Sequence, residues 1–404
     1  MRKLYRITAQ GIIDTLAKTL STNARASRLL EKLNLANPKW GSGDRNTVHR
    51  ATYEILRWKN YYSFLSGHDE TVDKKENLWS LLGVWLVINN LEVPDWEEFK
   101  SLNPKEIKAR QKEKTTPERT KSIPSWLYER GKKELSREWN IELDALNIEA
   151  KLILRVNRIV TSPKKLQEEL HSKYNIEALP IKGYEDALLI NKRTNLRKNP
   201  LYLKGSFEIQ DANSQKIGPF TDVKPGMNVI DGCAGAGGKT LHLASLMRNK
   251  GDIIALDVEE NKLKELKKRA RRNRVKIIKN IWVADAQYKE SLSNWADRVL
   301  IDAPCSGLGT LKRNPDLKWK LTEDRISEVI DLQRKILLEQ SNWVKKGGKL
   351  IYVTCSILPS ENQDQISWFL KQEAGKTFDL EKEETFFSHQ TEYDGFYAAR
   401  LIRR

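Results

Sequence analysis

The sequence predicts an α/β fold with three parts: a helical N-terminal region, a small α+β segment and a doubly wound parallel sheet. Three observations support this prediction. From Pro200 onward, short apolar runs alternate with longer helical stretches, which is typical of parallel strands joined by helices. A glycine-rich turn, CAGAGGKT, follows the first of these runs. Before about residue 100, apolar residues recur at helical spacing instead.

Residues 1–120 are expected to form the helical domain. Ile12, Leu16 and Leu20 recur at a four-residue spacing, and Asp44 is placed to cap the helix NTVHRATYEILRWKNYYSFL. The uncharged stretch NLWSLLGVWLVINNL is shorter than the ~20 residues that cross a bilayer, so it predicts a buried helix. Residues 104–121, PKEIKARQKEKTTPERTK, are basic and nearly devoid of aliphatic side chains, which favours an exposed linker.

Residues 121–204 are expected to form a small α+β subdomain, in which LILRVNRI is a strand and SPKKLQEELHSKY a helix. Residues 205–404 carry the alternating pattern of the doubly wound sheet. Its five expected strands lie in NVIDGC, DIIALD, IWVAD, RVLIDAPC and KLIYVTCS.

Composition narrows the classes of protein that fit. The chain has 404 residues, a formal net charge of +17 and three cysteines, Cys233, Cys305 and Cys355. So few cysteines exclude a disulfide scaffold, and no histidine stands at zinc-ligand spacing from them, so no metal is expected. The start of the chain lacks a secretory signal, and we expect a soluble, cytoplasmic protein. The positive charge favours a polyanionic partner, although a solvated basic surface explains it equally well.

The glycine-rich turn does not fit the common nucleotide motifs. A phosphate-binding loop requires G-x-x-x-x-G-K-[ST], but here Gly232 is one residue too far from Gly238-Lys239-Thr240. The pattern G-x-G-x-x-G can start at Gly235 but then meets Thr240 where a glycine is needed. Neither a nucleoside triphosphate nor a nicotinamide cofactor therefore fits.

Four acidic residues, Asp231, Asp257, Asp285 and Asp302, end successive predicted strands. Ligands of such sheets bind outside the carboxyl ends of the strands, so these carboxylates are expected to face one crevice. Carboxylates beside a glycine-rich turn suit a ligand with ribose hydroxyls and a positive charge, which describes S-adenosyl-L-methionine. Each acid taken singly fits an ordinary turn or cap; the four in register with the turn favour the cofactor.

Cys305 and Cys355 follow two predicted strands that should be neighbours, so both thiols are expected in that crevice. A single cysteine at a strand end is more often a buried small side chain. Two of them suit methylation of a pyrimidine at C5. A thiolate that adds to C6 makes C5 nucleophilic, an acid can bind the ring edge, and a second thiol can assist release.

The motifs CAGAGGKT, DAPCSGLGTLKRNPDLKW and VTCSILPSEN resemble those of the RNA cytosine-C5 methyltransferases of the RsmB/Sun type. The resemblance covers residues 200–404, with GSFEIQDANSQ and DGFYAARLI included, and reaches upstream to PSWL and LRVN. It implies a Rossmann-like class I methyltransferase domain at 205–404 and an RRM-like subdomain at 121–204. The helical segment 1–120 is similar to a NusB-like RNA-binding domain.

By this resemblance, Cys355 is the nucleophile, Cys305 assists product release, Asp302 contacts the target base and Lys239 reaches both cofactor and base. The family usually has Ala-Pro where this chain has Gly235-Ala236, which removes a rigid turn residue. Spacing alone leaves open which cysteine attacks. The implied cofactor contacts are Cys233, Ala234, Gly235, Ala236, Gly237, Gly238, Lys239, Asp257, Asp285 and Asp302.

RNA is the expected partner, with 16S rRNA as the expected substrate of a monomeric enzyme. The expected RNA contacts are Arg155, Asn157, Lys312, Arg313 and Lys318, and the basic stretch from Lys262 to Lys279 is a further candidate for phosphate binding. Two alternatives remain: the same chemistry on tRNA or 23S rRNA, and a non-catalytic RNA-binding ribosome assembly factor.

Overall fold

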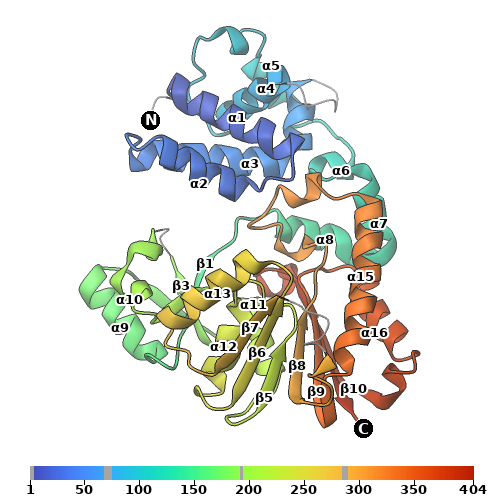
Figure 1. Ribbon diagram of the computed structural model, residues 1–404. Helices are drawn as coiled ribbons and strands as arrows, with labels where there is room; N and C mark the ends of the chain where they lie inside the picture. Colours follow the sequence, from blue (N-terminus) through green and yellow to red (C-terminus); the bar gives the residue numbers. More distant parts are fainter. Residues whose placement is uncertain (1–3, 68–74, 192–193, 284–289) are drawn as a thin grey trace. The chain divides into compact units, whose positions relative to one another are not determined.

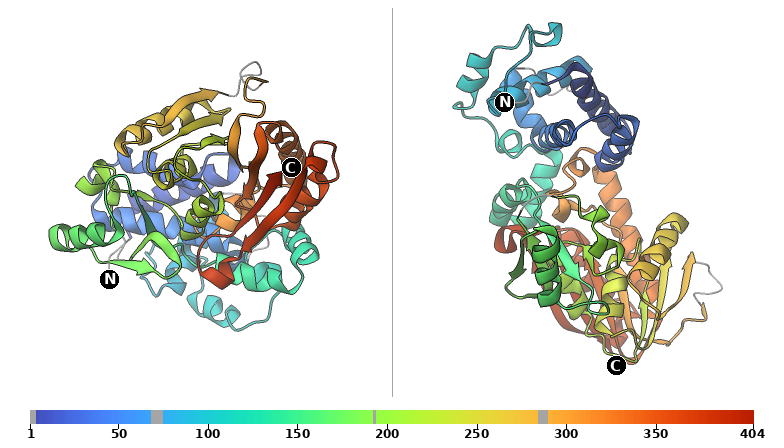
Figure 2. Two further views of the ribbon diagram at one scale, coloured as in Figure 1. Left: turned by 90° about the horizontal axis from the view of Figure 1, so that it is seen from below. Right: turned by 90° about the vertical axis from the view of Figure 1, so that its left-hand side faces the viewer.

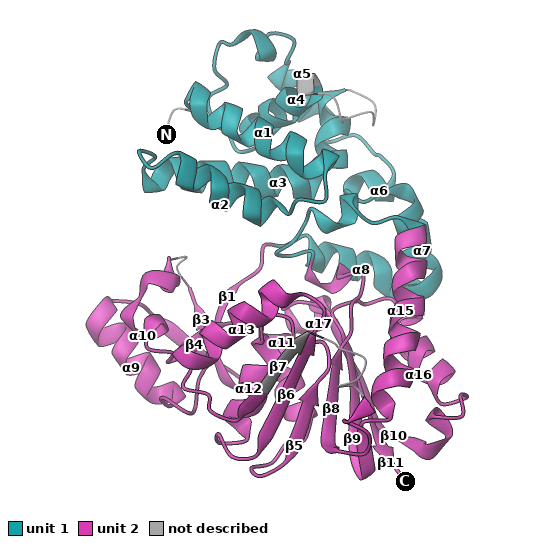
Figure 3. Ribbon diagram, in the orientation of Figure 1, with its two compact units in different colours: residues 1–148, 311–323 teal, residues 149–310, 324–404 magenta. Residues whose placement is uncertain are grey.

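The computed structural model describes residues 4–67, 75–191, 194–283 and 290–404. They form two compact units, shown in different colours in Figure 3. Unit 1 comprises Met1–Ile148 and Leu311–Glu323, and unit 2 comprises Glu149–Thr310 and Asp324–Arg404. The predicted boundaries differ from this division, because residues 121–148 belong to unit 1 and a short piece of the C-terminal half does too.

Unit 1 is helical, as the sequence predicts. Its buried apolar side chains include Ile12, Leu16 and Trp85. Asp44 is not the N-cap: it lies in the first turn of α3, where its carboxylate accepts a hydrogen bond from the Gly41 N–H at 3.0 Å. The helices are α1 (Arg6–Ser21), α2 (Ala26–Ala36), α3 (Ser42–Ser66), α4 (Lys75–Ile88), α5 (Pro104–Arg110), α6 (Pro117–Thr120), α7 (Ser125–Leu135) and α8 (Arg137–Leu146).

The prediction of an exposed linker at 104–121 is wrong in part. Proline at the first helical position starts both α5 and α6, since its missing N–H is not needed there. Ile107, the one sizeable aliphatic residue of this segment, is buried in the core of unit 1. No helix in the described part of the chain is long and apolar enough to cross a membrane.

Residues 311–323 leave the C-terminal half of the sequence and pack within unit 1. The Trp319 indole donates to the Leu56 carbonyl at 2.6 Å, and Lys320 Nζ donates to the Ala24 carbonyl at 2.6 Å. Arg57 of α3 donates to the carbonyl of Lys312 at 2.8 Å. The sequence does not indicate that this segment packs in unit 1, since the segment directly continues the loop after Cys305.

Unit 2 contains two sheets (Figure 1). The smaller has the order β2-β3-β1-β4 and is antiparallel throughout. It confirms the predicted α+β segment but includes β4, beyond the predicted boundary at residue 204. Its strands are β1 (Leu152–Val156), β2 (Ala178–Ile181), β3 (Tyr184–Ile190) and β4 (Phe207–Ile209), with helices α9 (Pro163–Tyr174) and α10 (Pro200–Leu203).

The larger sheet has the order β10-β11-β9-β8-β5-β6-β7. Its five strands from β9 to β7 are parallel, which confirms the predicted doubly wound core, and β11 and β10 extend it antiparallel. Figure 2, left, views this sheet from below, with β10 and β11 in red. The strands are β5 (Asn228–Asp231), β6 (Asp252–Asp257), β7 (Ile278–Val283), β8 (Ala296–Asp302), β9 (Val344–Thr354), β10 (Phe378–Phe386) and β11 (Phe396–Arg403).

Strand order reverses between β5 and β8, because the chain after β5 first builds β6 and β7 on one side and then β8 on the other. Ligands of doubly wound sheets bind at such a point, outside the carboxyl ends of the strands. The helices of this part are α11 (Ala212–Phe220), α12 (Gly238–Leu246), α13 (Glu260–Arg272), α15 (Glu323–Ser341), α16 (Gln363–Phe369) and α17 (Ser388–Thr391).

Candidate active site

The glycine-rich turn connects β5 to α12 at the point where strand order reverses. Gly235 and Gly237 have φ values of +55° and +83°, which glycine adopts without the strain that a side chain would bring. A Cβ on Gly237 would lie 2.5 Å from Leu266 of α13, so this glycine also permits close packing of α13. At Gly235 and Gly238, by contrast, a Cβ would meet nothing within 4 Å. The turn therefore borders open space that a ligand can fill.

Two of the four strand-end acids hold this turn. Both Asp257 carboxylate oxygens accept backbone hydrogen bonds, from Gly235 N and Glu259 N at 2.8 Å each. Asp231 is fully buried, with Oδ2 accepting from the Thr240 hydroxyl at 2.6 Å and Oδ1 without a hydrogen-bond partner among the described residues. Burial raises the pKa of Asp231 to about 7. Asp285 lies outside the described residues.

Lys239 and Asp302 form an ion pair beside the turn, with Lys239 Nζ 2.6 Å from Asp302 Oδ2. Lys239 is 11% exposed and Asp302 31%, so the carboxylate is the more open of the two. Burial works against the lysine charge, but Asp302 and, more weakly, Cys355 outweigh it and raise the pKa of Lys239. A positive charge is therefore fixed near both the carboxylate and the Cys355 thiol.

The Cys305 and Cys355 thiols, which the sequence predicts to lie in one crevice, are neighbours in the structure. β8 and β9 are adjacent and parallel, and Cys305 Sγ lies 3.3 Å from Cys355 Sγ, with both cysteines free. The hydrogen bond with Cys355, followed by burial, raises the pKa of Cys305 well above that of an ordinary thiol. Cys233 lies apart in the glycine-rich turn, where burial raises the pKa of its thiol.

A buried glutamate that the sequence analysis did not single out connects the two cysteine loops. Glu361 Oε1 accepts from Ser306 N at 2.7 Å, and Oε2 accepts from the Ser306 hydroxyl at 2.5 Å and from the Ser356 hydroxyl. Gln333 of α15 donates to Oε1 at 3.3 Å. Each serine directly follows one of the cysteines, so Glu361 fixes both loops. The motif VTCSILPSEN contains this residue, but only the fold reveals its partners.

Two predicted RNA contacts in unit 2 are buried instead. Arg155 of β1 is 1% exposed and donates through Nη1 to the Gly238 carbonyl at 2.5 Å, and burial lowers its pKa to about 10. The Asn157 amide donates to the carbonyls of Gly205 and Asn273, both at 2.9 Å. These side chains brace the turn and the small sheet, and the prediction that they contact RNA is contradicted by their burial.

Two further predicted RNA contacts are buried in unit 1. Lys312 is 3% exposed with Nζ on the Ala145 carbonyl at 2.7 Å, and Lys318 is 1% exposed with Nζ on the Arg57 carbonyl at 2.8 Å. Burial, with the nearby Arg57 charge, lowers the pKa of Lys318 well below its ordinary value. Neither ammonium is available to a phosphate. Arg313 is half-buried, and its contact with RNA stays a prediction.

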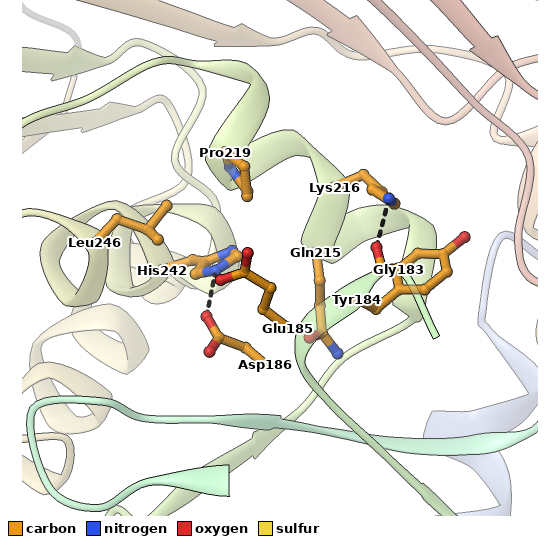
Figure 4. Close-up of a pocket in the computed structure, with 9 residues that line it drawn as sticks. All are labelled: Gly183, Tyr184, Glu185, Asp186, Gln215, Lys216, Pro219, His242 and Leu246. Atoms are coloured by element: carbon orange, nitrogen blue, oxygen red, sulfur yellow. Dashed lines mark hydrogen bonds and ion pairs between the residues drawn. The ribbon is translucent and has the colours of Figure 1, made fainter. Parts of the chain in front are cut away.

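Unit 2 also has a cavity of about 200 Å³, lined in part by His242 and Leu246 of α12 (Figure 4). Inside it, His242 Nε2 lies 3.4 Å from Asp186 Oδ2, and burial lowers the pKa of His242 to about 4. None of the predicted site residues lines this cavity. Its nine lining residues are Gly183, Tyr184, Glu185, Asp186, Gln215, Lys216, Pro219, His242 and Leu246.

Comparison with protein families gives two matches. Residues 220–402 match the family described as 16S rRNA methyltransferase RsmB/F. Residues 123–197 match the family described as Methyltr_RsmF/B-like, ferredoxin-like domain. The first match contains β5 to β9 and both cysteine loops, and the second contains β1, β2 and β3.

Among curated proteins, the chain is 35% identical over 298 residues to the ribosomal RNA small subunit methyltransferase B of Yersinia enterocolitica. That match spans 70% of this chain and 66% of the Yersinia protein. Among solved structures, PH0851 superposes with a TM-score of 0.81 at 26% identity and covers 99% of both chains. A methyltransferase homolog from Pyrococcus horikoshii has a TM-score of 0.63 at 25% identity, covering 71% of this chain and 98% of its own.

Proposed function

The chain belongs to the family of 16S rRNA methyltransferases RsmB/F, and on that premise we propose that it methylates C5 of a cytosine in RNA with S-adenosyl-L-methionine as the methyl donor. The observation that supports the chemistry best is the pair of thiols 3.3 Å apart, Cys305 and Cys355, at the ends of two parallel strands. The Lys239–Asp302 ion pair beside them adds a carboxylate for the base.

The residues around the glycine-rich turn fit the proposed cofactor. Open space faces Gly235 and Gly238, where any side chain would intrude, and the turn offers the backbone N–H groups at the start of α12. Asp257 is the proposed partner of the ribose hydroxyls and Asp302 of the positively charged end. When bound, S-adenosyl-L-methionine supplies an electrophilic methyl group on a sulfonium. The proposed contacts are those of the turn from Cys233 to Lys239 together with Asp257, Asp285 and Asp302.

Cys355 is the proposed nucleophile. Its thiolate adds to C6 of the cytosine, the ring electrons shift to C5, and C5 takes the methyl group while its own proton is still in place. The ion pair beside this thiol supports the assignment, because a nearby cation favours the thiolate, which is the nucleophilic form. Lys239, whose pKa Cys355 helps to raise, stabilises the negative charge on that sulfur.

Cys305 is proposed to act in the second half of the reaction. After methyl transfer a base removes the C5 proton, the C5–C6 double bond re-forms and the bond from C6 to the Cys355 sulfur breaks. The Cys305 thiol, 3.3 Å from that sulfur, can donate its proton as the bond breaks, so that Cys355 leaves as a thiol and Cys305 is left as a thiolate. Asp302 is proposed to bind the N3 and amino edge of the base, where charge develops during addition.

Replacement of each cysteine in turn tests these roles. With Cys305→Ala, addition and methyl transfer proceed but release slows, so a covalent protein–RNA adduct should accumulate on a denaturing gel. With Cys355→Ala, no adduct should form. Adduct formation by the Cys355 variant and none by the Cys305 variant would reverse the two roles.

The proposed substrate is 16S rRNA, because the family model and the Yersinia relative are both described by small-subunit rRNA. Bisulfite sequencing of total RNA, from cells with and without the gene, locates 5-methylcytosine at single-nucleotide resolution. Loss of one site in 16S rRNA supports the proposal. Loss of a site in tRNA or 23S rRNA replaces the substrate but keeps the chemistry, and an unchanged map favours a non-catalytic assembly factor.

A further inference from the structure

Helix α13 carries a row of basic side chains on the face opposite to its packing face. Leu263, Leu266 and Ala270 are buried, and α13 packs with them against β6 and β7 (Figure 1). Lys264, Lys267, Lys268 and Arg271 are exposed, and their spacing of three, four and seven residues from the first puts them on one stripe. Arg274 and Lys276, in the turn after the helix, are exposed as well.

Most acidic residues around α13 are engaged elsewhere. Glu260 pairs with Lys264 at 2.9 Å and Glu259 with Lys262 at 2.5 Å. Glu208, which is buried, receives Arg269 and Arg272 from the other side of the helix. Glu265 is exposed on α13 itself and is the one acid of the helix without such an ion pair among the described residues.

Five cations therefore remain without an acidic partner among the described residues: Lys267, Lys268, Arg271, Arg274 and Lys276. We call them the α13 basic surface. A solvated helix face commonly pairs its charges with residues three or four positions away, as Lys264 does. Here Glu265, three positions before Lys268, is the one acid of the helix placed to do so for these five, and it forms no ion pair among the described residues. Uncompensated positive charges close together raise the local potential and attract a polyanion.

The α13 basic surface is also firmly attached to the glycine-rich turn. Arg269 Nη1 donates to the Ala236 carbonyl at 2.7 Å, and Leu266 packs beneath Gly237. At the far end, the Asn249 amide donates to the Arg274 carbonyl at 3.1 Å and accepts from Lys276 N at 2.8 Å. The charges thus sit on a rigid support whose position is fixed relative to the candidate active site.

We propose that the α13 basic surface binds the phosphate backbone of the substrate RNA beside the cofactor turn. This inference rests on the proposed function for the identity of the polyanion. It assigns the RNA contacts of unit 2 to α13 and the turn after it, in place of the buried Arg155 and Asn157.

The test compares two triple variants of the full-length chain. Lys267→Gln, Lys268→Gln and Lys276→Gln together remove three charges from the surface. Lys164→Gln, Lys165→Gln and Lys371→Gln remove the same charge from exposed positions elsewhere in unit 2. The probe is a fluorescently labelled 16S rRNA transcript, and its affinity is measured by anisotropy at several salt concentrations. Thermal unfolding and S-adenosyl-L-methionine binding by calorimetry should match the parent in both variants.

We expect the surface variant to bind the transcript about tenfold more weakly at physiological salt, because phosphate contacts dominate such affinities. The slope of log K against log[salt] should fall in magnitude by about 0.7–0.9 for each lost phosphate contact. The control variant should match the parent. Equal affinity and slope in the surface variant and the control would overturn the inference.

Further outcomes distinguish a failure of this inference from a failure of the proposed function. If the parent binds the transcript through this surface but transfers no methyl group to any RNA, the proposed function fails and the inference stands. If the parent methylates RNA and the surface variant does so with unchanged KM for RNA, the inference fails alone. Binding of the parent to phosphatidylglycerol vesicles that the surface variant loses, with RNA affinity intact, would overturn it in favour of a membrane.

Discussion

At the scale of single residues, the candidate chemistry depends on side chains that are paired with one another. Lys239 pairs with Asp302, Cys305 with Cys355, and Glu361 with the serine that follows each cysteine. In such groups the protonation state of one member depends on the other, so single substitutions are expected to change more than the residue replaced.

Glu361 is expected to be a positioning residue for the thiols. In Glu361→Gln the amide oxygen can stay on the Ser306 N–H, but the NH₂ group then faces the two serine hydroxyls, which must rotate from donating to accepting, so weaker bonds between neutral groups hold the two loops and the loops loosen. Because a misplacement of about 1 Å can cost about a hundredfold, we expect turnover to fall by about that factor with S-adenosyl-L-methionine affinity unchanged. Glu373→Gln, at a side chain 90% exposed, is the control. Turnover equal to the control would contradict this role.

Asp231 makes stability depend on pH. Burial raises its pKa from an ordinary 3.8 to about 7, so the folded state holds the proton more tightly than the unfolded state. The tighter binding of this proton therefore adds its full amount to the free energy of unfolding below pH 3.8, and that amount is lost as pH rises through 7. Asp231→Asn cannot ionise and should escape this loss, which amounts to roughly 2–4 kcal/mol.

Denaturant unfolding of the cofactor-free protein near pH 5 and pH 8 measures this effect. The free energy of unfolding of the parent should fall more between the two conditions than that of Asp231→Asn. Asp379→Asn, at a side chain 59% exposed, should follow the parent. Parallel pH profiles for the parent and Asp231→Asn would show that Asp231 is ionised in the folded protein throughout.

At the scale of elements, the loops after β8 and β9 are held together by backbone contacts. Gly309 N donates to the Cys355 carbonyl at 2.9 Å, and Gly395 N donates to the Gly309 carbonyl at 2.7 Å. A Cβ on Gly309 would lie 2.1 Å from the Gly395 carbonyl oxygen, which is too close for any real contact. The atoms that this Cβ would meet belong to the backbone of Gly395 and Cys355, so no flexible side chain can move aside to make room.

Gly309→Ala should therefore push the Cys305 loop away from Cys355. We expect a loss of adduct formation by at least about tenfold, while the cofactor turn on β5 and α12 keeps its affinity for S-adenosyl-L-methionine. Gel analysis of the adduct in a Cys305→Ala background and calorimetry measure the two effects. Gly41→Ala, where φ is −69° and a Cβ would lie 3.5 Å from the Asp44 carboxylate, tests whether a glycine replacement without a clash is harmful in itself. Similar adduct yields in the two glycine variants would contradict the expectation.

The elements that could be predicted from sequence are those whose apolar pattern reflects burial on both faces. β5, β6, β8 and β9 have such patterns, and the adjacency of β8 and β9, which brings the two cysteines together, follows from the expected sheet order. β10 was missed because its sequence, FDLEKEETF, is charged and largely exposed, as an edge strand that pairs only with β11 can be. Glu361 was missed because its partners come from two separate loops.

At the scale of the whole molecule, the least predictable feature is the passage of residues 311–323 into unit 1. Lys312 and Lys318 follow the Cys305 loop closely in sequence, which suggested contacts with the target strand. Their side chains instead bind carbonyl oxygens of unit 1, from Ala145 and Arg57. The sequence shows how many residues separate these lysines from Cys305, but it does not show in which unit their loop packs. Only the fold therefore corrects the prediction that they contact RNA.

The packing of residues 311–323 in unit 1 makes part of the C-terminal half of the sequence depend on unit 1. In the full chain, the bonds after Lys312 and Lys318 should resist trypsin, because both side chains are buried and hydrogen-bonded within unit 1. In a chain that begins at residue 149, residues 311–323 lose these partners and Trp319 loses the Leu56 carbonyl. A segment without packing or hydrogen bonds opens readily to proteases. Cleavage after Lys312 and Lys318 should therefore be at least about tenfold faster in the truncated chain.

The exposed Lys346 supplies the internal reference, since the bond that follows it should be cut at the same rate in both chains. Mass spectrometry of the timed digest identifies each cleavage site. Equal protection of Lys312 and Lys318 in the two chains would mean that residues 311–323 find other packing in unit 2 alone. Selective cleavage would show that unit 1 holds the continuation of the Cys305 loop in place, so that a helical unit without predicted catalytic residues still stabilises the part of the chain that carries the candidate active site.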